Sequence, residues 1–261
     1  MPRFAANLTM LFTELPFPDR FAAARKAGFR FVEYLFPYDY PADELRGLLA
    51  DNGLTQVLFN LPCGDWTAGE RGLAGLPGRE AEFRDGVGLA LDYAASLGVT
   101  RLNCLAGKLP PGVAPEAARE VLAGNVAFAA DALAARGLTL VIEAINHFDI
   151  PGFLLTRTAQ VMDLLTAVNR QNAAMQYDVY HAQREEGELA ATLAANMARI
   201  GHIQVADNPG RHQPGTGEIR YAFLFSELDR LGYEGVVGLE YVPTPDTIAS
   251  LDWIAAIHLC L

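Results

Sequence analysis

Residues 136–143, Arg-Gly-Leu-Thr-Leu-Val-Ile-Glu, contain the pattern that decides the fold of this chain. Gly137 is placed where a helix should end in the left-handed conformation. The apolar run after it is typical of a parallel strand covered on both faces. Glu143 then closes the run with a carboxylate. The stretch predicts a helix-to-strand turn, a buried strand and a polar residue at the carboxyl end of that strand.

The same alternation of short apolar runs and longer amphipathic segments occurs eight times along the 261 residues. Four other helix-to-strand turns have a glycine at the equivalent position: Gly28, Gly53, Gly98 and Gly232. Eight parallel strands, each followed by a helix, predict an α/β fold, a single (β/α)8 TIM barrel over residues 1–261. The expected strands span residues 4–9, 31–34, 56–61, 101–105, 139–143, 174–178, 200–205 and 236–240.

The composition disfavours several classes of protein. The chain has 20 Lys+Arg and 31 Asp+Glu, a net charge of −11, whereas proteins that bind phosphate backbones need a basic face. Polar residues interrupt every apolar run before the roughly 18 to 20 residues of a membrane helix, and we predict no signal peptide. The 3 cysteines show no CxxC spacing and predict neither a disulfide framework nor a zinc knot. We expect a cytoplasmic protein that binds neither nucleic acid nor membranes.

Four consecutive expected strands, the fifth to the eighth, end in residues whose oxygen atoms can bind a hard cation: Glu143, Asp178, Gln204 and Glu240. A lone carboxylate at such a position is more often a helix cap or a loop anchor. Closure of a barrel, however, brings the carboxyl ends of these strands to one mouth. Three carboxylates and an amide suit Mg²⁺ or Mn²⁺ better than Zn²⁺, so the sequence predicts a divalent metal site.

Five further polar residues follow expected strands and are candidates for substrate binding: His181, Arg211, Lys108, Asp149 and Asp207. Arg211 lies in a Gly/Pro-rich loop and offers a planar fork for a carboxylate or for sugar hydroxyls. Lys108 either attracts an anionic substrate or is a solvated loop residue. His181 is alternatively a histidine that caps or packs against the sixth helix.

The longest irregular stretch, residues 62–78, follows the third expected strand. It should therefore lie on the face where such barrels bind their substrates. A substrate lid and a plain surface insertion both account for this stretch.

The motifs resemble those of the xylose isomerase-like (β/α)8 barrels, and within them the hydroxypyruvate isomerase group. The resemblance covers essentially the full chain, from FAANLTMLFTELPF at residues 4–17 to GLEY at residues 238–241. Between them lie NCLAGK, VIEAINHFDIPGF, QYDVYHAQ and HIQVADNPGRHQPGTGEIRY. This resemblance implies a barrel enzyme that is an intramolecular oxidoreductase.

The resemblance also implies roles for individual residues. A divalent metal ion would be held by Glu143, Asp178, Gln204 and Glu240, with Glu143 and Glu240 also moving protons between adjacent carbons. Related sugar epimerases have a histidine at the position of Gln204, which favours the hydroxypyruvate isomerase branch. Two activities of that branch stay open: conversion of hydroxypyruvate to tartronate semialdehyde, and isomerisation of four-carbon 2-oxo-tetronate.

The expected partner is a small anionic hydroxy-oxo acid, and the sequence is compatible with a homo-oligomer. A ketose 3-epimerase-like activity is a further alternative. Barrels that cut DNA at abasic sites need several histidines and a basic groove, and this chain has 5 histidines and a charge of −11. A non-catalytic sugar-binding barrel would leave four convergent oxygen ligands without a purpose.

Overall fold

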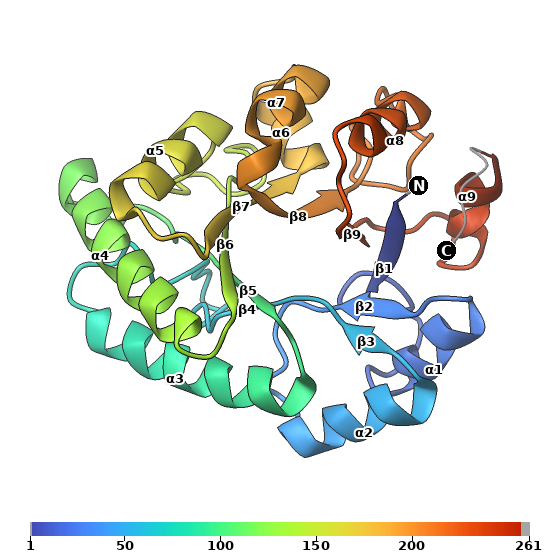
Figure 1. Ribbon diagram of the computed structural model, residues 1–261, viewed down its shortest axis with the longest axis horizontal. Coiled ribbons are helices and arrows are strands. Elements are labelled where there is room, and N and C mark those ends of the chain that lie inside the picture. Colours follow the sequence, from blue (N-terminus) through green and yellow to red (C-terminus); the bar gives the residue numbers. More distant parts are fainter. Residues whose placement is uncertain (1, 257–261) are drawn as a thin grey trace.

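The computed structural model describes residues 2–256, and within that range every paired strand is parallel to its neighbour. Helices surround these strands on the outside, which confirms the predicted (β/α)8 architecture (Figure 1). The strands are β1 (Arg3–Asn7), β2 (Phe31–Glu33), β3 (Thr55–Gln56), β4 (Phe59–Asn60), β5 (Arg101–Cys104), β6 (Thr139–Glu143), β7 (Ala173–Asp178), β8 (Ile200–Val205) and β9 (Val236–Leu239).

The barrel closes through its third strand, which is divided into β3 and β4. The sheet order is β3-β2-β1-β9-β8-β7-β6-β5-β4, so the two pieces of one continuous stretch lie at the two ends of the sheet. After β3, Val57 N donates to Val32 O of β2 at 2.9 Å. After β4, Leu61 N donates to Asn103 O of β5 at 2.8 Å. The predicted unbroken strand at 56–61 is corrected accordingly, because the stagger of a barrel makes one strand pair with its two neighbours at different heights.

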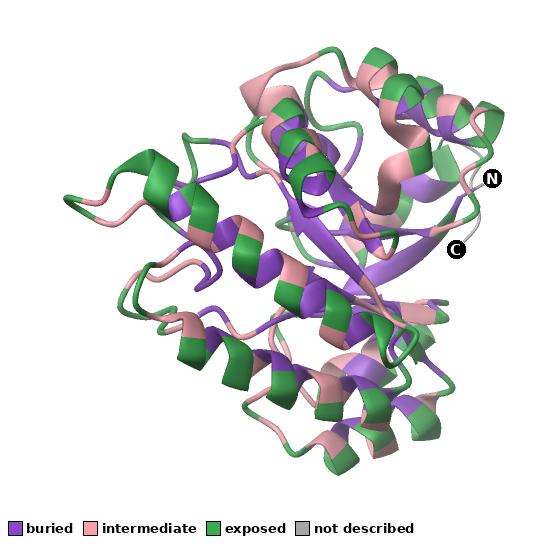
Figure 2. Ribbon diagram, turned by 60° about the vertical axis from the view of Figure 1, so that its left-hand side comes forward, coloured by how far each residue is buried: buried purple, intermediate pink, exposed green. Residues whose placement is uncertain are grey.

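The helices are α1 (Asp19–Lys26), α2 (Ala42–Asn52), α3 (Glu80–Leu97), α4 (Pro115–Ala134), α5 (Thr158–Val168), α6 (Val179–Glu185), α7 (Leu189–Asn196), α8 (Tyr221–Arg230) and α9 (Asp252–Ala256). Each longer helix has buried residues on the side facing the strands and exposed residues on the other side (Figure 2). All five glycines predicted to end helices have a positive φ, from 58° at Gly53 to 99° at Gly28. The local chemistry of these turns was therefore predicted correctly.

The inside of the barrel has an apolar end and a polar end. Ala5, Val57, Val141 and Val236 belong to a small buried cluster that is separate from the main core between strands and helices. Side chains that point to the same face of a strand are two residues apart, so Asn7 and the strand-end carboxylates lie further along the same inward faces. The polar end of the barrel interior is thus built on the carboxyl ends of the strands.

Gly238 on β9 provides space for one of the buried carboxylates. A Cβ atom at this position would collide with the carboxylate of Glu33, which points into the barrel from β2. Because Glu33 is fully buried, the glycine is a packing requirement of the polar end.

Within residues 2–256, no helix combines the length and the apolar character that crossing a membrane requires. Cys63 and Cys104 are buried free thiols, whereas Cys260 lies outside the described residues. Burial raises the pKa of the Cys63 thiol to about 11 and that of Cys104 to about 12. These two cysteines are therefore packing residues rather than reactive thiolates.

An aromatic cluster joins β1 to α8 and α9. Phe4 packs edge-on against Phe225 and Trp253, with ring centroids 5.5 and 5.4 Å apart. Phe225 is 2% exposed, while Phe223, two residues earlier on the same helix, is 48% exposed. The two phenylalanines therefore form a matched pair for testing the packing of α8.

We predict that Phe225→Ala lowers the free energy of unfolding by about 3–5 kcal/mol, because it removes a large buried side chain and leaves a cavity. Phe223→Ala is the control and should change it by about 0.5 kcal/mol or less. Urea unfolding followed by circular dichroism measures both variants. Equal losses in the two would contradict the packing described for α8.

Candidate active site

The candidate site consists of four buried polar side chains at the carboxyl ends of neighbouring strands. Glu143 is the last residue of β6 and Asp178 the last of β7, Gln204 lies one residue before the end of β8, and Glu240 directly follows β9. These strands are consecutive in the ring, so their carboxyl ends meet at one mouth. The structure thus brings all four sequence-predicted residues to the same end of the barrel.

Asp178 uses its two carboxylate oxygens differently. Oδ1 accepts hydrogen bonds from the backbone N–H of Tyr180 at 2.7 Å and of His181 at 3.3 Å, and so caps α6. Oδ2 is buried and has no hydrogen-bond partner among the described residues. It lies 3.7 Å from Arg211 Nη2. Asp178 therefore caps the helix with Oδ1 and leaves Oδ2 available to the site.

Glu143 is held from one side and open on the other. Its Oε2 accepts from Asn103 Nδ2 at 3.3 Å and from Gln176 Nε2 at 3.0 Å. Its Oε1 lies 3.9 Å from His181 Nε2, which in turn is 3.8 Å from Asp178 Oδ2. One potential ligand atom from each of Glu143, Asp178 and His181 lies within 4.8 Å of the others. This buried group could hold a metal ion.

Gln204 is held by hydrogen bonds at both ends of its side-chain amide. Its Nε2 donates to Glu33 Oε1 at 2.8 Å, and its Oε1 accepts from Gln176 Nε2 at 2.6 Å. Gln176 also donates to Glu143, so it links Gln204 to the carboxylate of β6. On its other oxygen, Glu33 is 2.7 Å from His202 Nε2. Gln204 therefore belongs to a continuous polar network inside the barrel.

Arg211 places a positive charge among the carboxylates. It lies in the loop after β8 with a positive φ of 57°, and its carbonyl accepts from Val242 N at 2.7 Å. Its Nη2 is 3.3 Å from Glu240 Oε2, and its guanidinium lies over the Tyr180 ring at 5.2 Å. The side chain is 23% exposed, so Arg211 is the cation that faces both the carboxylates and the mouth of the barrel.

Burial and mutual repulsion dominate the electrostatics of the carboxylates. Burial raises the pKa of Glu240 to about 8, with Asp178 and Glu33 adding to the rise and Arg211 opposing it. The pKa of Glu143 is well above its usual value because of burial and of the neighbouring Glu240 and Asp178. Burial also raises the pKa of Asp178, although Arg211 opposes this. Without an added cation, these carboxyls hold protons at a pH where ordinary carboxyls have lost them.

The Arg211 and His181 side chains respond to the same environment. Burial works against the charge of Arg211, but Glu240, Asp178 and Glu143 outweigh it and raise the pKa of the guanidinium. Burial lowers the pKa of His181 well below its usual value, and the positive charges of Arg211 and Arg184 act in the same direction. The site thus combines a charged arginine with a neutral histidine.

The other predicted substrate-binding residues have different surroundings. Asp149 Oδ1 pairs with Arg184 Nη1 at 3.0 Å, close to α6. Asp207 accepts from the backbone N–H of Gly215 at 2.8 Å and of Gly217 at 2.9 Å, so it shapes the loop that carries Arg211. A role for Asp149 and Asp207 in substrate binding stays a prediction.

Lys108 is exposed, and none of the four strand-end residues lines the cavity that it borders. Lys108 lines this cavity of about 510 Å³ together with Glu70, Arg71 and Arg79. These three residues belong to the segment after the third strand or follow it directly, and Gly75 N in this segment donates to Ala106 O at 2.9 Å. Whether this segment acts as a lid stays a prediction, as does a role of Lys108 in substrate binding.

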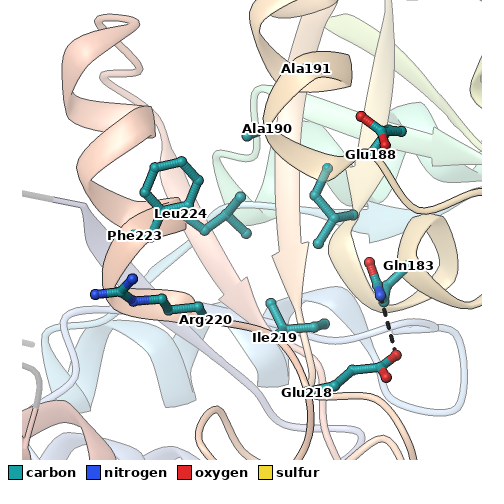
Figure 3. A pocket seen from close by; sticks show the side chains of 10 residues that line it. Gln183, Glu188, Ala190, Ala191, Glu218, Ile219, Arg220, Phe223 and Leu224 are labelled. Atoms are coloured by element: carbon teal, nitrogen blue, oxygen red, sulfur yellow. Dashed lines mark hydrogen bonds between the residues drawn. The ribbon is translucent and has the colours of Figure 1, made fainter.

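A further surface pocket, of about 300 Å³, lies between α6, α7 and α8 (Figure 3). Phe223, Leu224 and Ile219 supply its apolar lining, and a 3.2 Å hydrogen bond from Gln183 to Glu218 closes one edge. None of the four strand-end residues lines it. This pocket is therefore separate from the candidate site.

Five buried polar residues that complete the site were not predicted from the sequence. Two of them could have been found, because each lies two residues before a predicted strand-end ligand and so on the same inward face. The others contact the site from strands or loops whose pattern gave no signal. The five are Gln176, His202, Glu33, Asn103 and Asn146.

A family model described as xylose isomerase-like TIM barrel matches residues 21–257 of the chain. The chain belongs to this family. The hydroxypyruvate isomerase of Escherichia coli is 52% identical over 254 residues, which cover 97% of this chain and 98% of that protein. The 2-oxo-tetronate isomerase of Cupriavidus necator is 50% identical over the same coverage. Membership of the family confirms the resemblance drawn from the motifs.

Two solved structures show the same fold as this chain. A crystal structure from Brucella melitensis, named AP endonuclease, family 2, has a TM-score of 0.96 and 45% identity, and covers 98% of this chain and 99% of that one. The structure of D-psicose 3-epimerase from Clostridium cellulolyticum, with D-tagatose, has a TM-score of 0.77 at 17% identity over the full length of both chains. The second likeness shows the fold alone.

We predict that Asp178→Asn keeps the cap of α6 and Asp178→Ala loses it, because an asparagine oxygen can still accept from Tyr180 N. Both variants lack the buried negative charge, so the difference between them isolates the cap. Asp178→Ala should be less stable than Asp178→Asn by about 0.5–2 kcal/mol in urea unfolding with a chelator present. Equal stability of the two variants would mean that Oδ1 does not cap the helix.

Proposed function

We propose that the chain is an isomerase that interconverts hydroxypyruvate and 2-hydroxy-3-oxopropanoate with the help of a divalent metal ion. The observation that carries this proposal is the group of buried carboxylates Glu143, Asp178 and Glu240, which faces Arg211 at the mouth of the barrel. Relatives at 52% and 50% identity are named hydroxypyruvate isomerase and 2-oxo-tetronate isomerase. The four-carbon substrate therefore stays a second candidate for the same site.

The residues at the barrel mouth fit a hard cation. Asp178 Oδ2 is a buried acceptor that receives no hydrogen bond from the described part of the chain, and both it and Glu143 Oε1 lie within 4 Å of His181 Nε2. We propose that Glu143, Asp178, Gln204 and Glu240 hold Mg²⁺ or Mn²⁺ through oxygen atoms. When bound, such an ion polarises the substrate carbonyl and stabilises negative charge on its oxygens.

We propose that Glu143 and Glu240 move the proton between carbons. In this isomerisation C3 of hydroxypyruvate loses a proton and C2 gains one, while the hydroxyl proton moves from O3 to O2. A carboxylate oxygen of one glutamate takes the carbon-bound proton, and the adjacent carbon receives a proton from a glutamate carboxyl. Burial raises the pKa of Glu143 and Glu240, which makes each a stronger base than an exposed carboxylate, whereas a bound cation opposes that rise.

Arg211 is the better candidate for the carboxylate of the substrate. Its Nη2 faces Glu240 and Asp178, but its buried Nε has no hydrogen-bond partner among the described residues. The guanidinium therefore has a free donor beside the carboxylates that act on the carbons. Lys108 is exposed and lines a different cavity.

A nuclease reading, suggested by the name of the Brucella structure, has less support. Cleavage at abasic sites uses a cluster of zinc ions with several histidines and a basic groove. Among the described residues, the one potential metal-binding group of histidines, cysteines and carboxylates contains a single histidine, His181. The net charge of −11 also opposes binding to DNA.

The deciding experiment is an assay on hydroxypyruvate and on 2-oxo-tetronate after chelation. We expect turnover to disappear when metal ions are removed and to return with Mg²⁺ or Mn²⁺, and the ratio of kcat/KM for the two acids identifies the better substrate. Undiminished turnover in protein shown to be free of metal would overturn the metal-dependent proposal. Inactivity on both acids with every metal tested would overturn the isomerase proposal.

Within this assay, we predict that Glu143→Gln and Glu240→Gln each lower kcat by about 10²- to 10⁴-fold, because the amide keeps the shape and cannot carry the proton. The matched control is Glu218→Gln, an exposed carboxylate in the loop after β8, which should leave kcat unchanged. Circular dichroism checks that the fold is intact. Near-wild-type turnover in either active-site variant would show that the proton is carried elsewhere.

We predict that Arg211→Ala lowers kcat/KM by about 10- to 100-fold, the worth of a hydrogen bond between charged groups. Arg211→Lys should recover only part of this loss, since an ammonium cannot make a bidentate contact. Lys108→Ala is the comparison and should have a smaller effect. If Lys108→Ala alone is impaired, the substrate carboxylate is held by Lys108; if neither is impaired, it is held by other groups.

A further inference from the structure

We infer that Asn146 is a positioning residue that fixes the tautomer of His181, so that His181 acts as a hydrogen-bond donor at Nε2 and not as a metal ligand. Both side chains are buried at the mouth of the barrel. His181 is close enough to Glu143 and Asp178 to be a ligand by distance alone. The hydrogen bond between Asn146 and Nδ1 of the ring argues against that role.

The orientation of the Asn146 amide is fixed by two contacts with Asp149. Its Oδ1 accepts from the backbone N–H of Asp149 at 2.9 Å, and its Nδ2 donates to Asp149 Oδ2 at 3.1 Å. Rotating the amide by half a turn would place donor against donor and acceptor against acceptor. Asp149 is itself held by Arg184, which pairs with its other oxygen at 3.0 Å. The Asn146 Nδ2 group is therefore the one that faces His181.

This orientation determines where the hydrogen on the His181 ring lies. Asn146 Nδ2 is 2.6 Å from His181 Nδ1. An amide nitrogen can only donate, so Nδ1 must accept through its lone pair and cannot carry a hydrogen. The hydrogen of the neutral ring is then on Nε2. This assignment of the tautomer follows from the contacts of Asn146 and does not depend on the protonation of Glu143, Asp178 or Glu240.

Nε2 is the ring atom that faces the site. It lies 3.9 Å from Glu143 Oε1 and 3.8 Å from Asp178 Oδ2, too far for a hydrogen bond to either. An Nε2–H group has no lone pair for a cation, but it can donate to a substrate oxygen bound between these carboxylates. Under the proposed function, on which this step rests, the cation then has oxygen ligands only, as Mg²⁺ and Mn²⁺ prefer.

The test is the tautomer of His181, read by two-dimensional NMR that correlates ring protons with ring nitrogens. The protein has 5 histidines, and a His181→Gln variant identifies the signal of interest. In chelated wild-type protein we expect Nδ1 to resonate as a bare nitrogen and Nε2 as a protonated one. The reverse pattern in the wild type would overturn the inference without any variant being made.

Asn146→Ala tests the role of the amide. We expect a mixture of the two tautomers, and a fall in kcat/KM of about 10-fold, the upper end of what a neutral hydrogen bond contributes. Asn103→Ala is the matched control for the tautomer. It removes a buried amide that contacts Glu143 and should leave His181 in its wild-type tautomer. An unchanged tautomer in Asn146→Ala would overturn the positioning role.

The NMR measurement needs neither substrate nor metal, so it separates this inference from the proposed function. If both keto acids fail as substrates while His181 carries its hydrogen on Nε2, the proposed function is wrong and the tautomer assignment holds. If both acids are converted but Asn146→Ala changes only the tautomer and not kcat/KM, the positioning role in catalysis is wrong. Zinc affinity gives an independent readout: Asn146→Ala should bind Zn²⁺ more tightly than the wild-type protein does, because Nε2 gains a lone pair in part of the molecules.

Discussion

Three carboxylates buried within one end of a closed barrel impose the constraint on which the rest of the site depends. Glu143, Asp178 and Glu240 are removed from water, and the pKa of Glu143 is raised by the other two and that of Glu240 by Asp178. Burying a charge is costly unless it is paired or neutralised. The positive charge of Arg211 offsets part of this cost. Arg211 lies against Glu240 and Asp178 and belongs to a loop, not to a strand of the barrel.

Several backbone contacts hold the loop that carries Arg211. Arg211 has the left-handed backbone conformation, which is unfavourable for a residue with a side chain. This conformation is accompanied by two sets of contacts: the Arg211 carbonyl accepts from Val242 N, and the Asp207 carboxylate accepts from four backbone N–H groups of the same loop. Asp207 therefore acts on the site by holding the loop that supplies its positive charge.

The orientation of the amides inside the barrel follows from their contacts with the carboxylate of Glu33 on β2. Glu33 Oε1 accepts from Gln204 Nε2, so Gln204 turns its Oε1 toward Gln176. Gln176 must then present its Nε2, which also donates to Glu143. Reversing one amide would leave two acceptors facing each other at the next contact, which is why the network has one consistent direction. The oxygen of Gln204 is thereby directed away from β2.

Much of this arrangement could be predicted from the sequence, for definite reasons. Glycines such as Gly137 mark helix ends because few other residues adopt a positive φ, and apolar runs such as residues 138–142 mark strands that are covered on both faces. The same covering hides the inward polar residues, since a strand that is apolar on both sides has no visible alternation. Only their spacing of two residues from Asp178 and Gln204 marks Gln176 and His202. The contacts of Arg211 could not be predicted because they depend on the path of a loop.

The charges of the site connect the proposed cation to the proposed substrate. With all three carboxylates ionised, they and Arg211 sum to −3 + 1 = −2, a charge that repels an anionic acid. The raised pKa values of Glu143, Asp178 and Glu240 show the response of the protein alone, which is to keep protons in the site. A divalent cation held by these residues would change the sum to −2 + 2 = 0 and would favour release of those protons. Arg211 would then be less strongly paired with its carboxylate neighbours, and its Nε, which has no hydrogen-bond partner among the described residues, could donate to an incoming carboxylate. The proposed cation would thus be needed to bind the substrate as well as for the chemistry that follows.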